Sequence, residues 1–279
     1  MARFDTIYVV DWSAAGKPCT GANSIWIGIW RGGAPATVNP ATRAEAMALL
    51  RAEMAADARA GRRVLAGFDF ALGYPSGLTR ALGVADWRGV WAILAEGLSD
   101  GADNANTRFH FAGALNALYF RGQGPFWGNG LRAEVPGLPR RKPSGWGTLL
   151  PDNLRACDAR ARGAQEVWKL SGAGSVGGQT LTGIARLEPL RHATGATVWP
   201  FEPPGPGPVL AEVYPSFWPL DLQDGGLRDQ AQVRQTAVRL AGLDRAGDLA
   251  ELVSERRRMS PEVVNHAGWM LGVPVMHES

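Results

Sequence analysis

The fold of this chain is decided by two stretches, IYVVDWSAAG (residues 7–16) and VLAGFDFALGYP (residues 64–75). In each, an apolar run reaches one aspartate, Asp11 or Asp69, and then enters a turn. Such runs are typical of buried strands. A carboxylate at the end of a buried strand loses hydration, which is costly unless a cation or hydrogen bonds replace the water. We therefore expect both aspartates to face one cation-binding cleft; the alternative is that each only caps its own turn.

The composition is that of an ordinary folded protein, with 46% hydrophobic and 20% charged residues among 279. The 36 glycines, 19 prolines and 11 tryptophans indicate many loops anchored by aromatic side chains. A formal net charge of +3 is compatible with a polyanionic partner but does not require one.

Several classes of protein are disfavoured by what the sequence lacks. The two cysteines, Cys19 and Cys157, form no CxxC motif, so neither a disulfide framework nor a thiolate zinc site is expected. No HExxH or GxSxG motif is present, which argues against a zinc hydrolase and a serine triad. The apolar run near the N-terminus is too short for a signal peptide, and no apolar stretch approaches the roughly 18 residues of a membrane span. We expect a cytoplasmic protein with no membrane partner.

The predicted elements follow one another in an informative order. Strands are expected first at residues 7–10, 24–30 and 36–38, followed by a helix at 42–61 and a buried strand at 64–70. A strand at 209–214 and helices at 228–240 and 244–256 close the chain. We expect one domain over residues 1–279, with residues 71–208 as a Gly/Pro/Trp-rich insertion. This is the order of an α/β, ribonuclease-H-like core: a mixed sheet with flanking helices, whose first strand is central.

Further acidic residues extend the candidate site. Glu212 lies in AEVYPS, directly before a strand is broken by proline, and Asp248 or Asp244 lies on the final helices. Hard cations such as Mg²⁺ or Mn²⁺ prefer oxygen ligands, and two such ions can activate water for phosphodiester cleavage. The alternative is that Glu212 and Asp248 lie on solvated surfaces.

Three segments are candidates for contacts with a phosphorylated substrate. The turn from Ser13 to Lys17 is small and ends in a lysine, as in the phosphate loop of actin-like and sugar-kinase ATPases, although an ordinary surface turn has the same composition. The basic patch Arg140, Arg141 and Lys142 lies beside Trp146, a combination that suits nucleic acid or a solvated loop equally. The third segment is the glycine-rich stretch at residues 172–177.

Residues 172–177 match G-x-G-x-x-G. Gly183 and Pro189 are expected to interrupt any helix that follows, which argues against dinucleotide binding. We expect instead a glycine-rich loop at Gly174 that lines the cleft, where backbone N–H groups can hold an anion.

Eight stretches together give the chain a family resemblance over nearly its whole length: VVDWSAAG, GFDFALGYP, NTRFHFAGALN, GPFWGNG, KLSGAGSVGGQTLTG, VWPFE, AEVYPS and HAGWMLGV. In these stretches the chain resembles the DUF429 family of predicted nucleases. The resemblance implies a ribonuclease-H-like core with acidic site residues at Asp11, Asp69 and Glu212. Some members of that family are linked to molybdopterin guanine dinucleotide synthesis.

The leading hypothesis is an Mg²⁺- or Mn²⁺-dependent phosphodiesterase or nuclease acting on nucleic acid or a nucleotide. Asp11 would bridge two ions, Asp69 and Asp248 would each ligate one, and Glu212 would complete the shell or orient water. Arg140, Arg141, Lys142 and residues 172–178 would contact the substrate. The alternatives are a phosphotransferase of the actin or sugar-kinase class that holds phosphates at Ser13–Lys17, and an accessory protein of cofactor synthesis that only binds its ligand.

Overall fold

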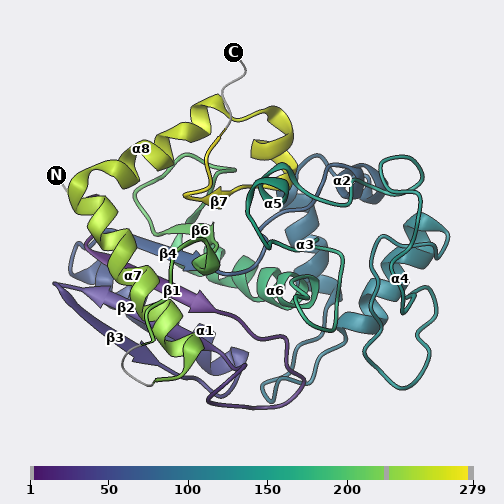
Figure 1. The fold of residues 1–279 in the computed structure, drawn as a ribbon, viewed down its shortest axis with the longest axis horizontal. Coiled ribbons are helices and arrows are strands. Elements are labelled where there is room, and N and C mark those ends of the chain that lie inside the picture. Colours follow the sequence, from purple (N-terminus) through teal and green to yellow (C-terminus); the bar gives the residue numbers. More distant parts are fainter. Residues whose placement is uncertain (1–2, 223–225, 276–279) are drawn as a thin grey trace.

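A mixed sheet of seven strands organises the protein, and helices cover both of its faces (Figure 1). The computed structural model describes residues 3–222 and 226–275. The strands are β1 (Thr6–Asp11), β2 (Trp26–Arg31), β3 (Ala34–Val38), β4 (Val64–Phe68), β5 (Thr197–Trp199), β6 (Val209–Val213) and β7 (Met270–Leu271).

The first strand has a central place in the sheet. The strand order is β3-β2-β1-β4-β6-β5, and β7 pairs with the end of β6. β1 and β2 are antiparallel, as are β2 and β3, whereas β1, β4, β6 and β5 run parallel to one another. The carboxyl ends of β1, β4 and β6 therefore meet at one edge of the sheet.

Alternation along β1 divides the apolar core between the two faces of the sheet. Tyr8 and Val10 are buried in a cluster that includes residues of helices α1 (Arg43–Arg59) and α6 (Gly177–Thr194). Ile7 and Val9 point to the opposite cluster, which contains residues of α7 (Arg228–Ala246). The two-faced burial explains why the strand sequence is apolar without interruption.

Close packing of α7 on the sheet depends on a glycine. A Cβ added at Gly28 of β2 would lie 2.4 Å from the carbonyl oxygen of Val233 in α7. Only glycine lets the helix backbone approach the strand this closely. This contact holds the first turns of α7 over the antiparallel half of the sheet, as Figure 1 shows.

The expectation that Gly183 and Pro189 interrupt a helix is wrong. Both lie inside α6, which runs for 18 residues. A Cβ at Gly183 would lie 2.2 Å from the ring of Phe70, so the glycine permits tight packing of the helix on the residues that follow β4. Burial of α6 along most of its length offsets the propensity cost of about 1 kcal/mol for glycine and about 3 kcal/mol for proline.

Residues 71–208 join β4 to β6 and combine peripheral and core elements. The peripheral helices are α2 (Gly77–Leu82), α3 (Trp87–Gly97), α4 (Arg108–Phe120) and α5 (Ala156–Arg160). α6 and β5, which close this segment, belong to the core, because α6 packs against α1 and β5 pairs with β6. After α7 the chain continues into α8 (Asp248–Ser254). Within the described residues, no helix is both long and apolar enough to cross a membrane.

Candidate functional site

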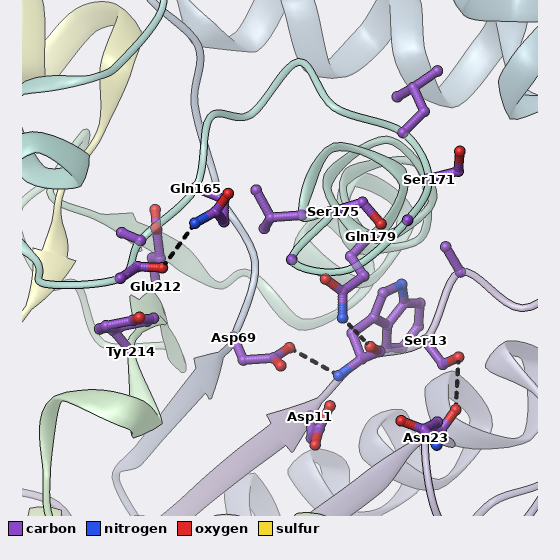
Figure 2. Close-up of a pocket in the computed structure, with 18 of the residues that line it drawn as sticks. Asp11, Ser13, Asn23, Asp69, Gln165, Ser171, Ser175, Gln179, Glu212 and Tyr214 are labelled. Carbon is purple, nitrogen blue, oxygen red and sulfur yellow. Dashed lines mark hydrogen bonds between the residues drawn. The ribbon is translucent and has the colours of Figure 1, made fainter. Parts of the chain in front are cut away.

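Asp11 and Asp69 lie side by side at the carboxyl ends of two neighbouring parallel strands (Figure 2). β1 ends at Asp11, and Asp69 directly follows Phe68, which pairs with Val10. The backbone N–H of Asp69 donates a 3.1 Å hydrogen bond to the carbonyl of Val10. The backbone N–H of Trp12 donates to Asp69 Oδ1 at 2.8 Å. The structure thus brings these two predicted site residues together.

The turn after Asp11 is fixed by side chains from two helices. The buried indole of Trp12 donates a 3.1 Å hydrogen bond to Thr182 of α6. Gln179 of the same helix donates to the Trp12 carbonyl, and Figure 2 shows its side chain reaching toward the turn. The buried guanidinium of Arg43 donates to the Ser13 carbonyl at 2.9 Å. The backbone that follows Asp11 is therefore held by hydrogen bonds at Trp12 and Ser13.

Burial and mutual repulsion make this pair reluctant to ionise fully. Burial raises the pKa of Asp11, and the negative charges of Asp69 and Asp229 raise it further. Burial also raises the pKa of Asp69, although the hydrogen bond from the Trp12 backbone opposes this shift. In the described part of the chain no basic side chain forms an ion pair with either carboxylate. The pair therefore retains a proton at neutral pH unless a cation replaces it.

Asp229, which no sequence pattern indicated, lines the same cavity as the Asp11–Asp69 pair. It lies in the first turn of α7, where its Oδ2 accepts a 2.7 Å hydrogen bond from the backbone N–H of Asn23. A helix that follows a parallel strand begins near the edge where that strand ends. The signal that could have found Asp229 is therefore its position at the start of the helix after β6.

Asp248 and Asp244, the two candidates for the fourth carboxylate, lie elsewhere. Asp248 is exposed at the start of α8 and does not line the cavity. Asp244 accepts hydrogen bonds of 2.8 Å from the backbone N–H groups of Arg3 and Phe4. A rise of about 1.5 Å per residue puts Asp244 about 22 Å along α7 from Asp229. The assignment of Asp248 as a metal ligand is therefore corrected: the acidic residue of the C-terminal helices that lines the cavity with the pair is Asp229.

Glu212 reaches the cavity from β6, but its charge is already compensated. Arg155 Nη2 lies 2.6 Å from Glu212 Oε1, and Arg155 Nη1 donates to Oε2 at 2.7 Å. The same guanidinium contacts Asp158 at 2.7 Å, and all three side chains are buried. Burial raises the pKa of Glu212, and the Arg155 charge opposes this. Glu212 is thus a member of a closed ion-pair cluster rather than the open ligand that the sequence suggested.

The carboxylates share a cavity of about 620 Å³. Among the described residues that line it, five are acidic and two are basic: Asp11, Asp69, Asp158, Glu212, Asp229, Arg108 and Arg155. Arg155 serves Glu212 and Asp158, and no basic side chain in residues 3–222 or 226–275 forms an ion pair with Asp11, Asp69 or Asp229. The cavity thus suits a cationic ligand near these three residues.

The Asp11–Asp69 pair fits a divalent cation in the way that Mg²⁺ is commonly held. Mg²⁺ binds through one or two carboxylates and takes its remaining ligands from water and substrate phosphates. Within the described part of the chain, no three Asp, Glu, His or Cys side chains are placed to share one ion. Asp11 and Asp69 would therefore hold the ion alone, with open coordination positions toward the cavity.

The remaining predicted contact residues divide between the cavity and other surfaces. Ser13 and Gly174 line the cavity, whereas Lys17 is exposed outside it. Arg140, Arg141 and Lys142 do not line it either: Arg140 pairs with Glu134 at 2.9 Å and Lys142 with Glu166 at 3.2 Å. The structure therefore does not bring the basic patch to this site.

One basic residue of the cavity, Arg108, was not singled out from the sequence. It is the first residue of α4, within the peripheral segment. A lone arginine in the stretch NTRFHFAGALN carries no distinguishing pattern. Only the fold places it beside the glycine-rich loop.

Comparisons of this chain with family models, with curated proteins and with solved structures found no match.

Proposed function

We propose that this protein is a divalent-metal-dependent phosphodiesterase on a ribonuclease-H-like core, as a member of the DUF429 family that its sequence resembles. The observation that carries the proposal is the half-buried pair Asp11–Asp69 at the ends of two adjacent parallel strands. Among the residues that the structure describes, no basic side chain forms an ion pair with it. The strand order with β1 central, two antiparallel strands on one side and parallel strands on the other supports the proposed core.

The chain's own residues have separate roles in this proposal. Asp11 and Asp69 hold the ion, and the Trp12 backbone N–H fixes the orientation of Asp69. Asp229, which lines the same cavity, accepts the proton of the attacking water. A bound Mg²⁺ or Mn²⁺ would supply charge stabilisation at a phosphoryl oxygen. Water then adds to phosphorus, and the bond from phosphorus to the leaving ester oxygen breaks. That oxygen takes up a proton from solvent, and Asp229 releases to solvent the proton that it received.

The phosphotransferase alternative receives less support from the site. It required Lys17 to hold phosphates, but that side chain is exposed and does not line the cavity. The proposed substrate remains a nucleic acid, or a nucleotide that contains a phosphodiester bond.

The proposal is tested by hydrolysis assays on DNA, RNA and nucleotides with Mg²⁺ or Mn²⁺. The proteins compared are the wild type, Asp11→Asn and the matched control Asp248→Asn, which alters an exposed carboxylate outside the cavity. We expect metal-dependent cleavage by the wild type and the control, and a loss of at least about 10²-fold in Asp11→Asn. Identical rates for wild type and Asp11→Asn on every substrate would contradict the proposal.

A further inference from the structure

We propose that Arg108 and the glycine-rich segment 172–178 form a phosphate-binding subsite in the cavity that holds Asp11 and Asp69. This deepens the proposed function and rests on it only for the role of the two aspartates. The contacts of Arg108 and the start of α6 support the subsite itself.

Arg108 carries a half-buried positive charge whose hydrogen-bonding capacity is only partly used. Its Nη1 donates to Asn106 Oδ1 at 2.8 Å, but its Nε is buried without a partner. Within the described residues, no carboxylate forms an ion pair with it. An unmet donor on a buried guanidinium is costly unless a ligand or water accepts from it.

Asp100, the carboxylate whose charge acts on Arg108, is already paired with two other arginines. Asp100 Oδ1 pairs with Arg43, and Asp100 Oδ2 pairs with Arg186 at 2.7 Å. Burial and the charge of Arg43 lower the pKa of Arg108 to about 10, and Asp100 opposes this shift only in part. Arg108 therefore stays charged at neutral pH and lacks a counter-ion.

The start of α6 lies directly beside this guanidinium. A Cβ added at Gly178 would lie 3.3 Å from Arg108 Nε and 2.9 Å from the Leu170 carbonyl oxygen. The N–H of Gly177 donates to the Lys169 carbonyl at 2.9 Å, and the N-cap residue, Val176, has no side-chain acceptor for the N–H groups that follow in the first turn. Gly172 and Gly174, with φ of +90° and +70°, form the loop that leads into it. The N-terminus of this 18-residue helix and the charge of Arg108 thus favour an anion at the same place.

Phosphate fits this arrangement better than a carboxylate does. A phosphate group offers three or more oxygens, enough to accept from a guanidinium and from backbone N–H groups together. A divalent ion held by Asp11 and Asp69 also leaves coordination positions for phosphoryl oxygens. The shared chemistry is a phosphoryl group, which either a free nucleotide or a polynucleotide backbone can bring.

The test is calorimetric titration with inorganic phosphate in metal-free buffer containing a chelator. The variants are Arg108→Gln, Arg108→Lys and Arg141→Gln, the last removing an exposed charge outside the cavity. We expect phosphate to bind the wild type and Arg141→Gln equally, to bind Arg108→Gln about tenfold more weakly or worse, and to bind Arg108→Lys at an intermediate level. Near-ultraviolet circular dichroism of each variant, which reports tryptophan packing, shows that the fold is retained.

Two outcomes overturn the proposal: no phosphate binding by the wild type, or equal binding by wild type and Arg108→Gln. Parallel titrations with adenosine monophosphate and with a single-stranded oligodeoxynucleotide distinguish the sources of the phosphoryl group, and loss of either interaction in Arg108→Gln supports the subsite. Mn²⁺ titration keeps the two proposals apart. Phosphate binding without Mn²⁺ binding would refute the proposed function alone, and Mn²⁺ binding without phosphate binding would refute the subsite alone.

Discussion

The carboxylate of Asp69 accepts a 2.8 Å hydrogen bond from the backbone N–H of Trp12, the residue that follows Asp11. This bond links the ends of two strands that are 58 residues apart in the chain, since β1 ends at Asp11 and Asp69 follows β4. It fixes one carboxylate against the other although their charges repel. The closeness of the two carboxylates is unfavourable for the metal-free fold, but it is useful for binding a cation.

Asp11→Asn should stabilise the metal-free protein. Because burial and neighbouring carboxylates raise the pKa of Asp11, its ionised form is disfavoured in the folded state. At pH 8 the free energy of unfolding should rise by about 1 to 3 kcal/mol, the value of one or two pKa units. Urea denaturation with a chelator present measures this. Asp248→Asn should change the value by less than about 0.5 kcal/mol, and a destabilised Asp11→Asn would contradict the explanation.

Metal affinity should increase with pH, and binding should release protons. The pKa values of Asp11 and Asp69 are both raised, so the pair retains a proton well above the ordinary carboxyl range near 4. A cation displaces that proton, and affinity therefore grows as the pH rises through the raised values. Mn²⁺ titrations in buffers of different ionisation enthalpy count the protons released. A pH-independent affinity with no proton release would argue against the shared proton.

Arg155→Met should destabilise the fold strongly, because it leaves Glu212 and Asp158 buried without a cation. Both carboxylates contact the guanidinium at 2.6 to 2.7 Å. Loss of one partner from a buried ion pair costs about 3–5 kcal/mol. Urea denaturation at pH 7 measures the change, with the exposed Arg141→Met as control. A loss below about 1 kcal/mol would mean that the cluster does not stabilise the fold.

Asp57 should contribute stability that is lost in acid. Burial opposes its ionisation, but hydrogen bonds from Tyr8, Arg62 and Thr6 and the charge of Arg31 outweigh this and lower its pKa. Its contribution is present above the unfolded-state value near 3.9 and falls as the pH drops through the lower folded-state value. Asp57→Asn should cost about 2–4 kcal/mol at pH 7 and less below pH 3, as measured by urea denaturation. Equal losses at both pH values would contradict this role.

The sequence predicted the two strand ends that form this site, but it did not predict the residue that reaches the site from a distant helix. The runs that stop at Asp11 and Asp69 mark strand ends because burial on both faces demands uninterrupted apolar residues. Asp229 lies on a helix surface, where an acidic residue is common and carries no pattern of its own. The direction of α7 relative to the sheet decides the difference: α7 begins at the cavity with Asp229 and ends far from it, near Asp244 and the following Asp248.

Tertiary packing explains the other differences. α6 persists through Gly183 and Pro189 because it is buried against Phe70 and the sheet, a contact that local propensity does not include. The pairing of Glu212 with Arg155 joins residues that are 57 positions apart. No spacing rule predicts such a pair, so its closed ion-pair cluster became visible only in the fold.

Binding of Mn²⁺ by the wild type, Asp11→Asn, Asp69→Asn and Asp248→Asn, measured by calorimetry at pH 8, tests the central claim most directly. The wild type and Asp248→Asn should bind the ion with the same affinity, whereas Asp11→Asn and Asp69→Asn should each lose at least about 10-fold. Equal affinity in all four proteins, or no binding by the wild type, would contradict the assignment of Asp11 and Asp69 as the metal site.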